Sequence, residues 1–147
     1  MRKTDNNKEV VADIEKTMRY ISAIIKQKGR EILSGYSITP PQFVALQWLF
    51  ESGDMTIGEL SNNMYLACST TTDLIDRMEK NNLVMRVRDP KDRRVVRIHL
   101  LEEGARIIEE VIQKRQEYLA SVTGDFTSGE LSDLDYMLRK LYDEMKD

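Results

Sequence analysis

The segment from residue 56 to residue 100 most constrains the fold, because two short helical patterns in it stand directly before two short strand patterns. Thr56-Ile57-Gly58-Glu59 has the spacing of a helix capping box and opens the first short helix. The second begins around Cys68 to Thr70 and ends at Asn81-Asn82. The apolar positions expected to face inward are Ile57, Leu60, Met64, Leu74, Ile75 and Met78.

The residues after the second short helix predict a β-hairpin. The stretches 83–88 and 95–100 alternate in the manner of strands, and Asp89-Pro90-Lys91-Asp92 between them has the composition of a turn. Two short helices joined by a tight turn and followed by a hairpin predict a winged helix-turn-helix.

Longer helical patterns flank this segment. One runs from about Lys8 to Leu33, and Thr39-Pro40-Pro41-Gln42 opens a helix that stops near Gly53. Two more run from about Glu102 through Val122 and from the capping box Thr127–Glu130 toward the C-terminal end. The predicted fold is mainly α, or α+β by element count, in the order α-α-α-α-β-β-α-α.

The outer helices carry apolar seams that a helix-turn-helix does not need for its own core. Something must cover these seams, and an isologous dimer does so while matching a two-fold DNA site. We therefore expect one domain over residues 1–147, with a winged lobe at 39–101 and dimerisation helices at 8–34 and 102–146. The residues expected to dimerise are Ile14, Met18, Ile21, Leu131, Leu134, Leu138 and Leu141.

The charge distribution indicates contact with a polyanion in one place. The net charge is −3, but residues 67–99 hold eight Lys or Arg against five Asp or Glu. The predicted second short helix opens with the hydroxyl residues Ser69, Thr70, Thr71 and Thr72, which suit phosphate oxygens and base edges. One of Ser69 and Thr70 is expected to cap the helix, with Asp73 completing a box.

The tip of the predicted hairpin carries the densest positive charge. A tip of this kind suits the minor groove, whose negative potential attracts arginine. Asp89 and Asp92 are expected to hold some of the arginines in ion pairs or turn hydrogen bonds, so not every arginine is expected to reach DNA. The cations at the tip are Arg88, Lys91, Arg93 and Arg94.

These residues resemble those of the MarR family of bacterial transcriptional regulators. The resemblance rests on Glu59-Leu60-Ser61, on residues 69–80, on Leu83-Val84, on the wing from Arg88 to Arg94, and on Leu100-Leu101-Glu102-Glu103-Gly104. It implies an obligate triangular dimer joined by helices from both chain ends, recognition by the helix starting near Ser69, and a wing tip led by Asp92 and Arg94. The chain differs in having Asn82 where the family usually has glycine, and Leu101 where it often has threonine.

We expect a ligand-responsive repressor that binds double-stranded DNA as a homodimer in the cytoplasm, since no targeting or membrane segment is evident. The residues expected to contact DNA are Ser69, Thr70, Thr71, Thr72, Arg77, Arg88, Lys91, Asp92, Arg93 and Arg94.

Other interpretations remain open at this point. The wing is also compatible with docking an acidic protein, and Tyr20, Tyr36 and Trp48 are candidates for lining an effector crevice between the dimer helices and the winged lobe. An enzyme is disfavoured, because one histidine (His99), one cysteine (Cys68) and no glycine-rich phosphate loop leave no catalytic set. No metal site and no cofactor are predicted, and Cys68 is expected to be a small filler or an incidental DNA neighbour and not a redox sensor.

Overall fold

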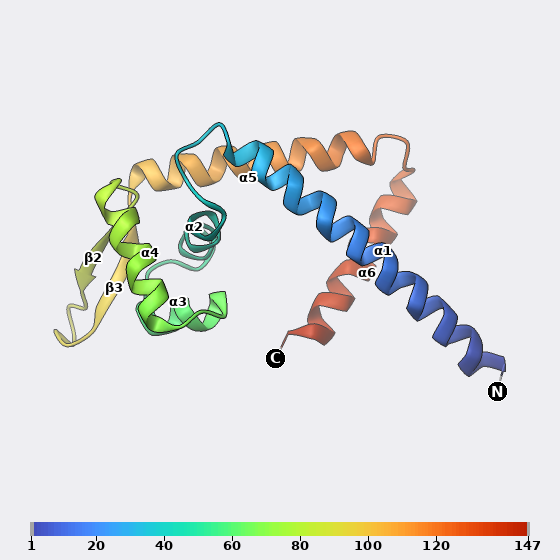
Figure 1. The fold of residues 1–147 in the computed structure, drawn as a ribbon, viewed down its shortest axis with the longest axis horizontal. Coiled ribbons are helices and arrows are strands. Elements are labelled where there is room, and N and C mark those ends of the chain that lie inside the picture. The colour runs from blue at the N-terminus through green and yellow to red at the C-terminus, as the bar shows by residue number, and fades with distance from the viewer. Residues whose placement is uncertain (1, 147) are drawn as a thin grey trace. The chain divides into compact units, whose positions relative to one another are not determined.

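The computed structural model of the chain describes residues 2–146, and it confirms the predicted mainly α winged helix-turn-helix (Figure 1). The first helix begins at Arg2, several residues before the predicted start at Lys8. The elements in this range are α1 (Arg2–Leu33), α2 (Pro40–Ser52), β1 (Met55–Thr56), α3 (Ile57–Met64), α4 (Cys68–Lys80), β2 (Val84–Arg88), β3 (Val96–Leu100), α5 (Glu102–Val122) and α6 (Ser128–Met145).

The sheet has one strand more than the sequence predicts. Its order is β1-β3-β2, and both pairings are antiparallel. In β1, Met55 pairs with Ile98 and Thr56 pairs with Arg97. A strand of two residues is too short to show an alternating pattern, so only its partner β3 reveals it.

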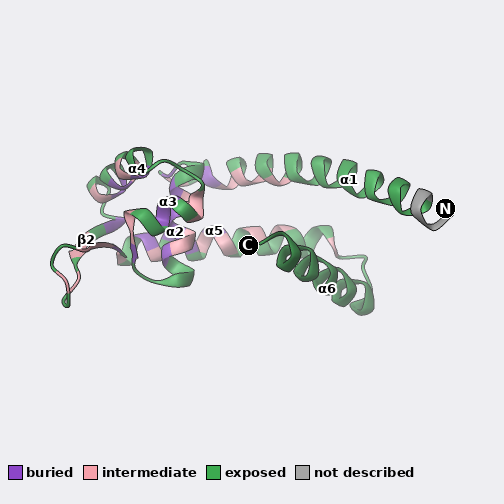
Figure 2. Cartoon of the chain, turned by 90° about the horizontal axis from the view of Figure 1, so that it is seen from below, coloured by how far each residue is buried: buried purple, intermediate pink, exposed green. Residues whose placement is uncertain are grey.

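The chain divides into two compact units, one up to Val111 and one from Ile112 onward. The core of the first unit combines the sheet with α2, α3, α4 and the start of α5, and Figure 2 shows the buried residues concentrated there. The fully buried side chains include Leu46, Leu60, Ile75, Met78, Val84, Ile98, Ile108 and Val111.

The start of α5 is packed against the backbone between α4 and β2. The Leu101 N–H donates to the Leu83 carbonyl over 3.0 Å. Gly104 is buried in the next turn, where a Cβ atom would lie 2.4 Å from that same carbonyl oxygen. A side chain at position 104 is therefore excluded by backbone, which explains the glycine in the Glu-Glu-Gly segment.

The helix starts follow the local sequence in most places. Thr39 and Thr127 form complete capping boxes with Gln42 and Glu130, as predicted. Thr56 accepts a hydrogen bond from the Glu59 N–H, which gives half of the predicted box.

The start of α4 differs from the prediction. Its N-cap is Ala67, which offers no side-chain hydrogen bond, so neither Ser69 nor Thr70 caps this helix. Both residues already lie inside the first turn, because helical geometry begins at Cys68.

The outer helices keep their apolar seams exposed in the single chain. On α1, Ile14, Met18 and Ile21 are all exposed. On α6 no residue is buried, and Leu131, Leu134, Leu138 and Leu141 remain open to solvent. Among the described residues, no helix combines the length and the apolar character needed to cross a membrane.

Candidate nucleic-acid interface

The two helices of the helix-turn-helix meet at a tight turn. Tyr65 ends α3 in the left-handed conformation (φ 56°), and the Leu66 N–H donates to the Ser61 carbonyl. The chain then enters α4 at once, and residues 65–70 are all exposed. Backbone N–H groups in the first turn of a helix have no partner within the helix, so this end of α4 presents donors as well as hydroxyls.

The four hydroxyl residues of this turn divide into two pairs. Ser69 and Thr70 are exposed and lie in the first turn. Thr71 is fully buried, and its hydroxyl donates to the Ala67 carbonyl over 3.1 Å. Thr72 is half-buried, and its hydroxyl donates to the Cys68 carbonyl over 2.9 Å.

The burial of Thr71 contradicts its place among the residues expected to contact DNA. The Thr71 hydroxyl is enclosed in the core and bonded to the backbone, so it has no path to a ligand outside the protein. Of the four hydroxyl residues, Ser69 and Thr70 are therefore the two that are exposed, and Thr72 is half-buried. Arg77 lies two turns further along α4 and is exposed, in keeping with a phosphate contact.

The wing, defined as residues 84–100, has a tip organised by Asp89. Its Oδ1 accepts hydrogen bonds from the backbone N–H groups of Lys91 (2.8 Å) and Asp92 (3.2 Å). Its Oδ2 accepts from Arg97 Nε over 3.0 Å. The bond from the Lys91 N–H, followed by the Arg97 side chain, lowers the pKa of the Asp89 carboxyl below its usual value.

This pKa direction predicts how the tip responds to acid. Because the pKa of Asp89 is lowered in the folded state, its ionised carboxylate stabilises the turn at any pH above the ordinary aspartate pKa of about 3.9. This stabilisation is lost only as the pH falls below that value and through the folded-state pKa. We expect the ¹³Cγ resonance of Asp89 to show a midpoint below the ordinary aspartate pKa. Arg97→Gln removes one donor and is expected to move the midpoint upward; an equal midpoint in both proteins would contradict the role of Arg97.

The remaining cations of the wing are presented to different degrees. Arg94 forms a local pair with Asp92, whose Oδ1 accepts from Arg94 Nε over 3.2 Å, yet the Arg94 side chain is 91% exposed. Arg88 donates a hydrogen bond to the Arg93 carbonyl over 3.0 Å. The side chains of Lys91 and Arg93 are also exposed. Asp92 thus holds Arg94, as predicted, whereas the arginine held by Asp89 is Arg97, outside the predicted tip.

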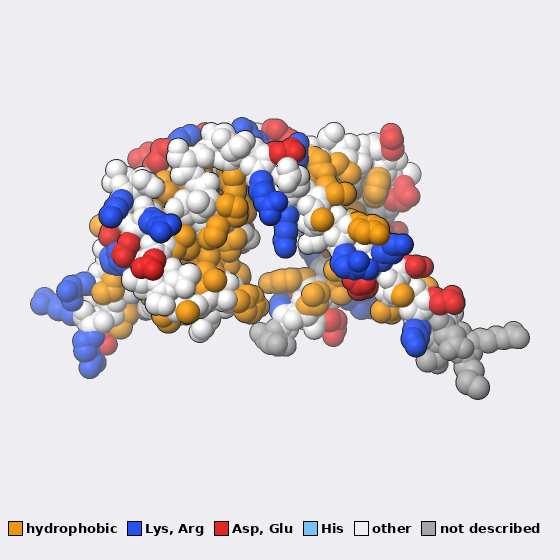
Figure 3. Space-filling view, viewed as in Figure 1, with side chains coloured by type: hydrophobic (Ala, Val, Ile, Leu, Met, Phe, Trp, Pro, Cys, Tyr) orange, Lys and Arg blue, Asp and Glu red, His pale blue; other side chains and the backbone are white. Residues whose placement is uncertain are grey.

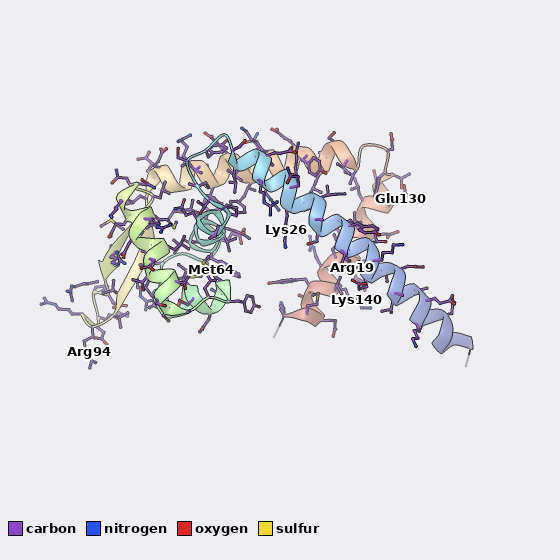
Figure 4. All side chains as sticks on the ribbon, viewed as in Figure 1. Arg19, Lys26, Met64, Arg94, Glu130 and Lys140 are labelled. Atoms are coloured by element: carbon purple, nitrogen blue, oxygen red, sulfur yellow. The ribbon has the colours of Figure 1, made fainter. Side chains whose placement is uncertain are left out.

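The pictures show the same arrangement. Lys and Arg side chains gather over the hairpin formed by β2 and β3 (Figure 3). Arg94 stands at its tip and points away from the body of the unit (Figure 4). The Asp92 pair orients Arg94 without burying it, so a phosphate or groove edge can still reach the guanidinium.

The sequence did not identify the role of two further arginines of the wing, which form ion pairs within the protein. Arg86 binds carboxylates of α4, and Arg97 lies between Asp89 and Glu59 of α3. The sequence offers no signal for either, since Arg86 lies near Asp76 and Arg97 near Glu59 only after folding.

The other candidate residues are distributed over the first unit. Tyr36 lines a cavity of about 360 Å³ and donates to Glu110 Oε2 over 3.0 Å, whereas Tyr20 and Trp48 are not among the residues lining that cavity. Cys68 is exposed at the first residue of α4, so the expectation that it fills a space in the core is wrong. His99 Nδ1 lies 2.8 Å from Asp54 Oδ1, which joins β3 to the loop before β1.

Comparison with known proteins agrees with this geometry. Residues 38–96 match the family model described as the MarR family. The chain is 71% identical over 138 residues to the HTH-type transcriptional regulator YsmB of Bacillus subtilis, a match that covers 94% of each chain. It is also 28% identical over 133 residues to the HTH-type transcriptional repressor MdtR of Bacillus subtilis, covering 90% of this chain and 86% of MdtR.

A solved structure extends the match to three dimensions. The structure of a MarR family protein from Bacillus stearothermophilus superposes with a TM-score of 0.90 at 63% sequence identity. The superposition covers 95% of this chain and 98% of that chain. Helices, sheet and wing are thus shared over nearly the whole length.

Proposed function

The chain belongs to the MarR family of DNA-binding transcriptional regulators, and on that premise we propose that it acts as a homodimeric repressor on a two-fold symmetric operator. The observation that carries the proposal is the pairing of two exposed DNA-facing elements in one unit. One is the first turn of α4 with Ser69 and Thr70, and the other is the wing tip with Arg94.

The two elements suit different tasks. The hydroxyls of Ser69 and Thr70 lie at a helix start, where they and the backbone N–H groups can bind base edges and phosphates in the major groove. Arg94 carries a fixed charge on a projecting hairpin, which suits the minor groove or the phosphate backbone. Docking to an acidic protein would use the cations of the wing, but it would not account for the exposed hydroxyls of Ser69 and Thr70.

The exposed seams and the family support the proposed dimer. Ile14, Met18 and Ile21 on α1 and the four leucines of α6 would stay in contact with water in a monomer. A symmetric dimer covers them and places two copies of α4 and the wing on the two halves of an operator.

Repression, an effector and location complete the proposal. Repression is favoured by the likeness to the repressor MdtR. The Tyr36-lined cavity, at about 360 Å³, has the size of a small-molecule pocket, so we place an effector there. A regulator must reach the chromosome, so we propose a cytoplasmic location.

The test is a pair of substitutions that separates the two DNA-facing elements. Arg94→Ala is expected to weaken binding to operator and to unrelated duplex alike by about tenfold, and to flatten the salt dependence by about one unit of slope. Thr70→Ala is expected to reduce discrimination between operator and unrelated DNA by about 1–3 kcal/mol while binding to unrelated DNA changes little. Fluorescence anisotropy at several salt concentrations measures both.

Arg139→Ala is the matched control, because this exposed arginine of α6 pairs with Asp135 on the same helix. It is expected to bind both duplexes like the wild type. Wild-type binding by Arg94→Ala would show that the wing does not touch DNA. An equal loss on both duplexes for Thr70→Ala would assign Thr70 to phosphate and not to bases.

A further inference from the structure

Arg86 joins β2 of the wing to two turns of α4. Its Nη2 lies 2.6 Å from Asp76 Oδ1, and its Nη1 lies 2.7 Å from Glu79 Oε1. Both carboxylates come from α4, at positions three residues apart that share one face of the helix. One guanidinium therefore binds two points of α4 at once.

The backbone reinforces this contact. β2 is an edge strand, because within residues 2–146 only β3 pairs with it. The Arg86 N–H donates to Glu79 Oε2 over 3.1 Å, so the Glu79 carboxylate accepts from both the main chain and the side chain of Arg86. The contact thus fixes the strand itself and not only a long side chain.

The burial and charge of Arg86 set it apart from the DNA-facing cations. Its side chain is 30% exposed, against 91% for Arg94. Its hydrogen bond to Asp76, followed by the charge of Glu79, raises its pKa above the usual arginine value. A guanidinium shared between two carboxylates is neutralised locally, so it is poorly suited to bind phosphate.

Arg97 forms a similar tie on the neighbouring strand. It lies 3.0 Å from Asp89 at the wing tip and 3.5 Å from Glu59 on α3. The wing is thereby attached to both helices of the helix-turn-helix, through Arg86 to α4 and through Arg97 to α3. Of the two ties, the one through Arg86 has the shorter distances.

We propose that Arg86 is a positioning residue, which fixes the wing relative to α4 so that the wing tip and the first turn of α4 reach DNA as one unit. This inference rests on the proposed wing contact. If the wing and α4 were independent, each would have to be ordered separately on binding, at an added cost in entropy. Holding them together in advance removes that cost and couples their contacts.

A double-mutant cycle tests the coupling. Arg86→Met keeps a long unbranched stem and removes the hydrogen bonds. In the wild-type background, Arg94→Ala is expected to lower operator affinity about tenfold. In the Arg86→Met background, the same change is expected to lower operator affinity by only about twofold, because the wing is already poorly placed. The ratio of the two effects, about fivefold, lies within the range of interaction energies measured for residues that are coupled.

Two further variants separate positioning from stability. Arg86→Lys retains one point charge that can bind one carboxylate at a time, so it is expected to restore part of the coupling. Arg139→Met applies the same change to an arginine paired on its own helix and is expected to leave the effect of Arg94→Ala at about tenfold. If Arg94→Ala weakens binding about tenfold in both the wild-type and the Arg86→Met backgrounds, the proposal is overturned.

A measurement without DNA completes the test. A nitroxide at Lys91→Cys, in a Cys68→Ala chain, reports the mobility of the wing tip through its spectral line shape. Arg86→Met is expected to increase that mobility, and unchanged mobility would overturn the positioning role. If Arg94→Ala has no effect in either background, the proposed wing contact fails, and the line shape alone then decides whether Arg86 holds the wing.

Discussion

Replacing Leu134 and Leu138 with glutamate is expected to turn the dimer into a monomer and to lower operator affinity by about a hundredfold or more. Both side chains lie on the seam of α6, exposed at 40% and 54% in the single chain. In the proposed dimer they are covered, so two carboxylates there would be buried without partners, at a cost of several kcal/mol each.

The loss of DNA affinity follows from the loss of linkage. In a dimer, binding of one half makes binding of the second an intramolecular step at high effective concentration. A monomer keeps α4 and the wing but binds each half-site alone. Its affinity for an isolated half-site should therefore stay near that of the wild-type chain, while its affinity for the full operator falls.

Analytical ultracentrifugation and anisotropy on full and half operators measure these two effects. Asp133→Glu is a control on the same helix, because it preserves charge at an exposed position. A double variant that sediments as a dimer and binds the full operator normally would remove α6 from the dimer interface.

Gly104→Ala is expected to destabilise the protein by about 3 kcal/mol or more, among the larger effects of adding a methyl group to a packed core. The added Cβ would lie 2.4 Å from the Leu83 carbonyl oxygen and 2.8 Å from Leu100 Cδ1. The first of these contacts is with backbone, which cannot move aside as a flexible side chain can. The Leu101–Leu83 hydrogen bond next to it would be strained as well.

Thermal and urea unfolding measure this effect, and a fall in Tm of about 10 °C is expected for a chain of this length. Gly58→Ala is the matched control. It lies in the first turn of α3, where the nearest atom to an added Cβ is Thr56 Oγ1 at 3.8 Å. That change is expected to be neutral or stabilising by up to about 1 kcal/mol. Equal stability of the Gly104→Ala and wild-type proteins would show that the contact relaxes freely.

Much of the fold follows from local sequence signals. The capping boxes at Thr39 and Thr127 depend on residues three apart, and the predicted helices and hairpin appear where apolar spacing and turn residues place them. Asn82 adopts a left-handed conformation (φ 60°), which asparagine tolerates in place of the usual glycine.

The sequence-based predictions were wrong where the structure depends on packing between residues far apart in the sequence. β1 exists because β3 offers it a partner, and Thr71 is enclosed because α4 packs its inner face on the core. The exposed hydroxyl turn and the cationic wing tip were predictable in their location, since both are visible in the sequence. Their internal organisation was not predictable, because the Arg86 and Arg97 ties join residues that only the fold brings together.

Neighbouring residues at the start of α4 are under different evolutionary constraints. Thr71 is constrained by the core, whereas Ser69 and Thr70 project outward and cap nothing. Gene duplicates of such a regulator can therefore exchange Ser69 and Thr70 with little loss of stability. With the base contacts proposed above, such single changes would give them new operators. Mutations at Arg86 lack this freedom, because they disturb the wing as well as α4. Divergence of DNA preference among paralogues should accordingly concentrate at positions 69 and 70 and leave position 86 unchanged.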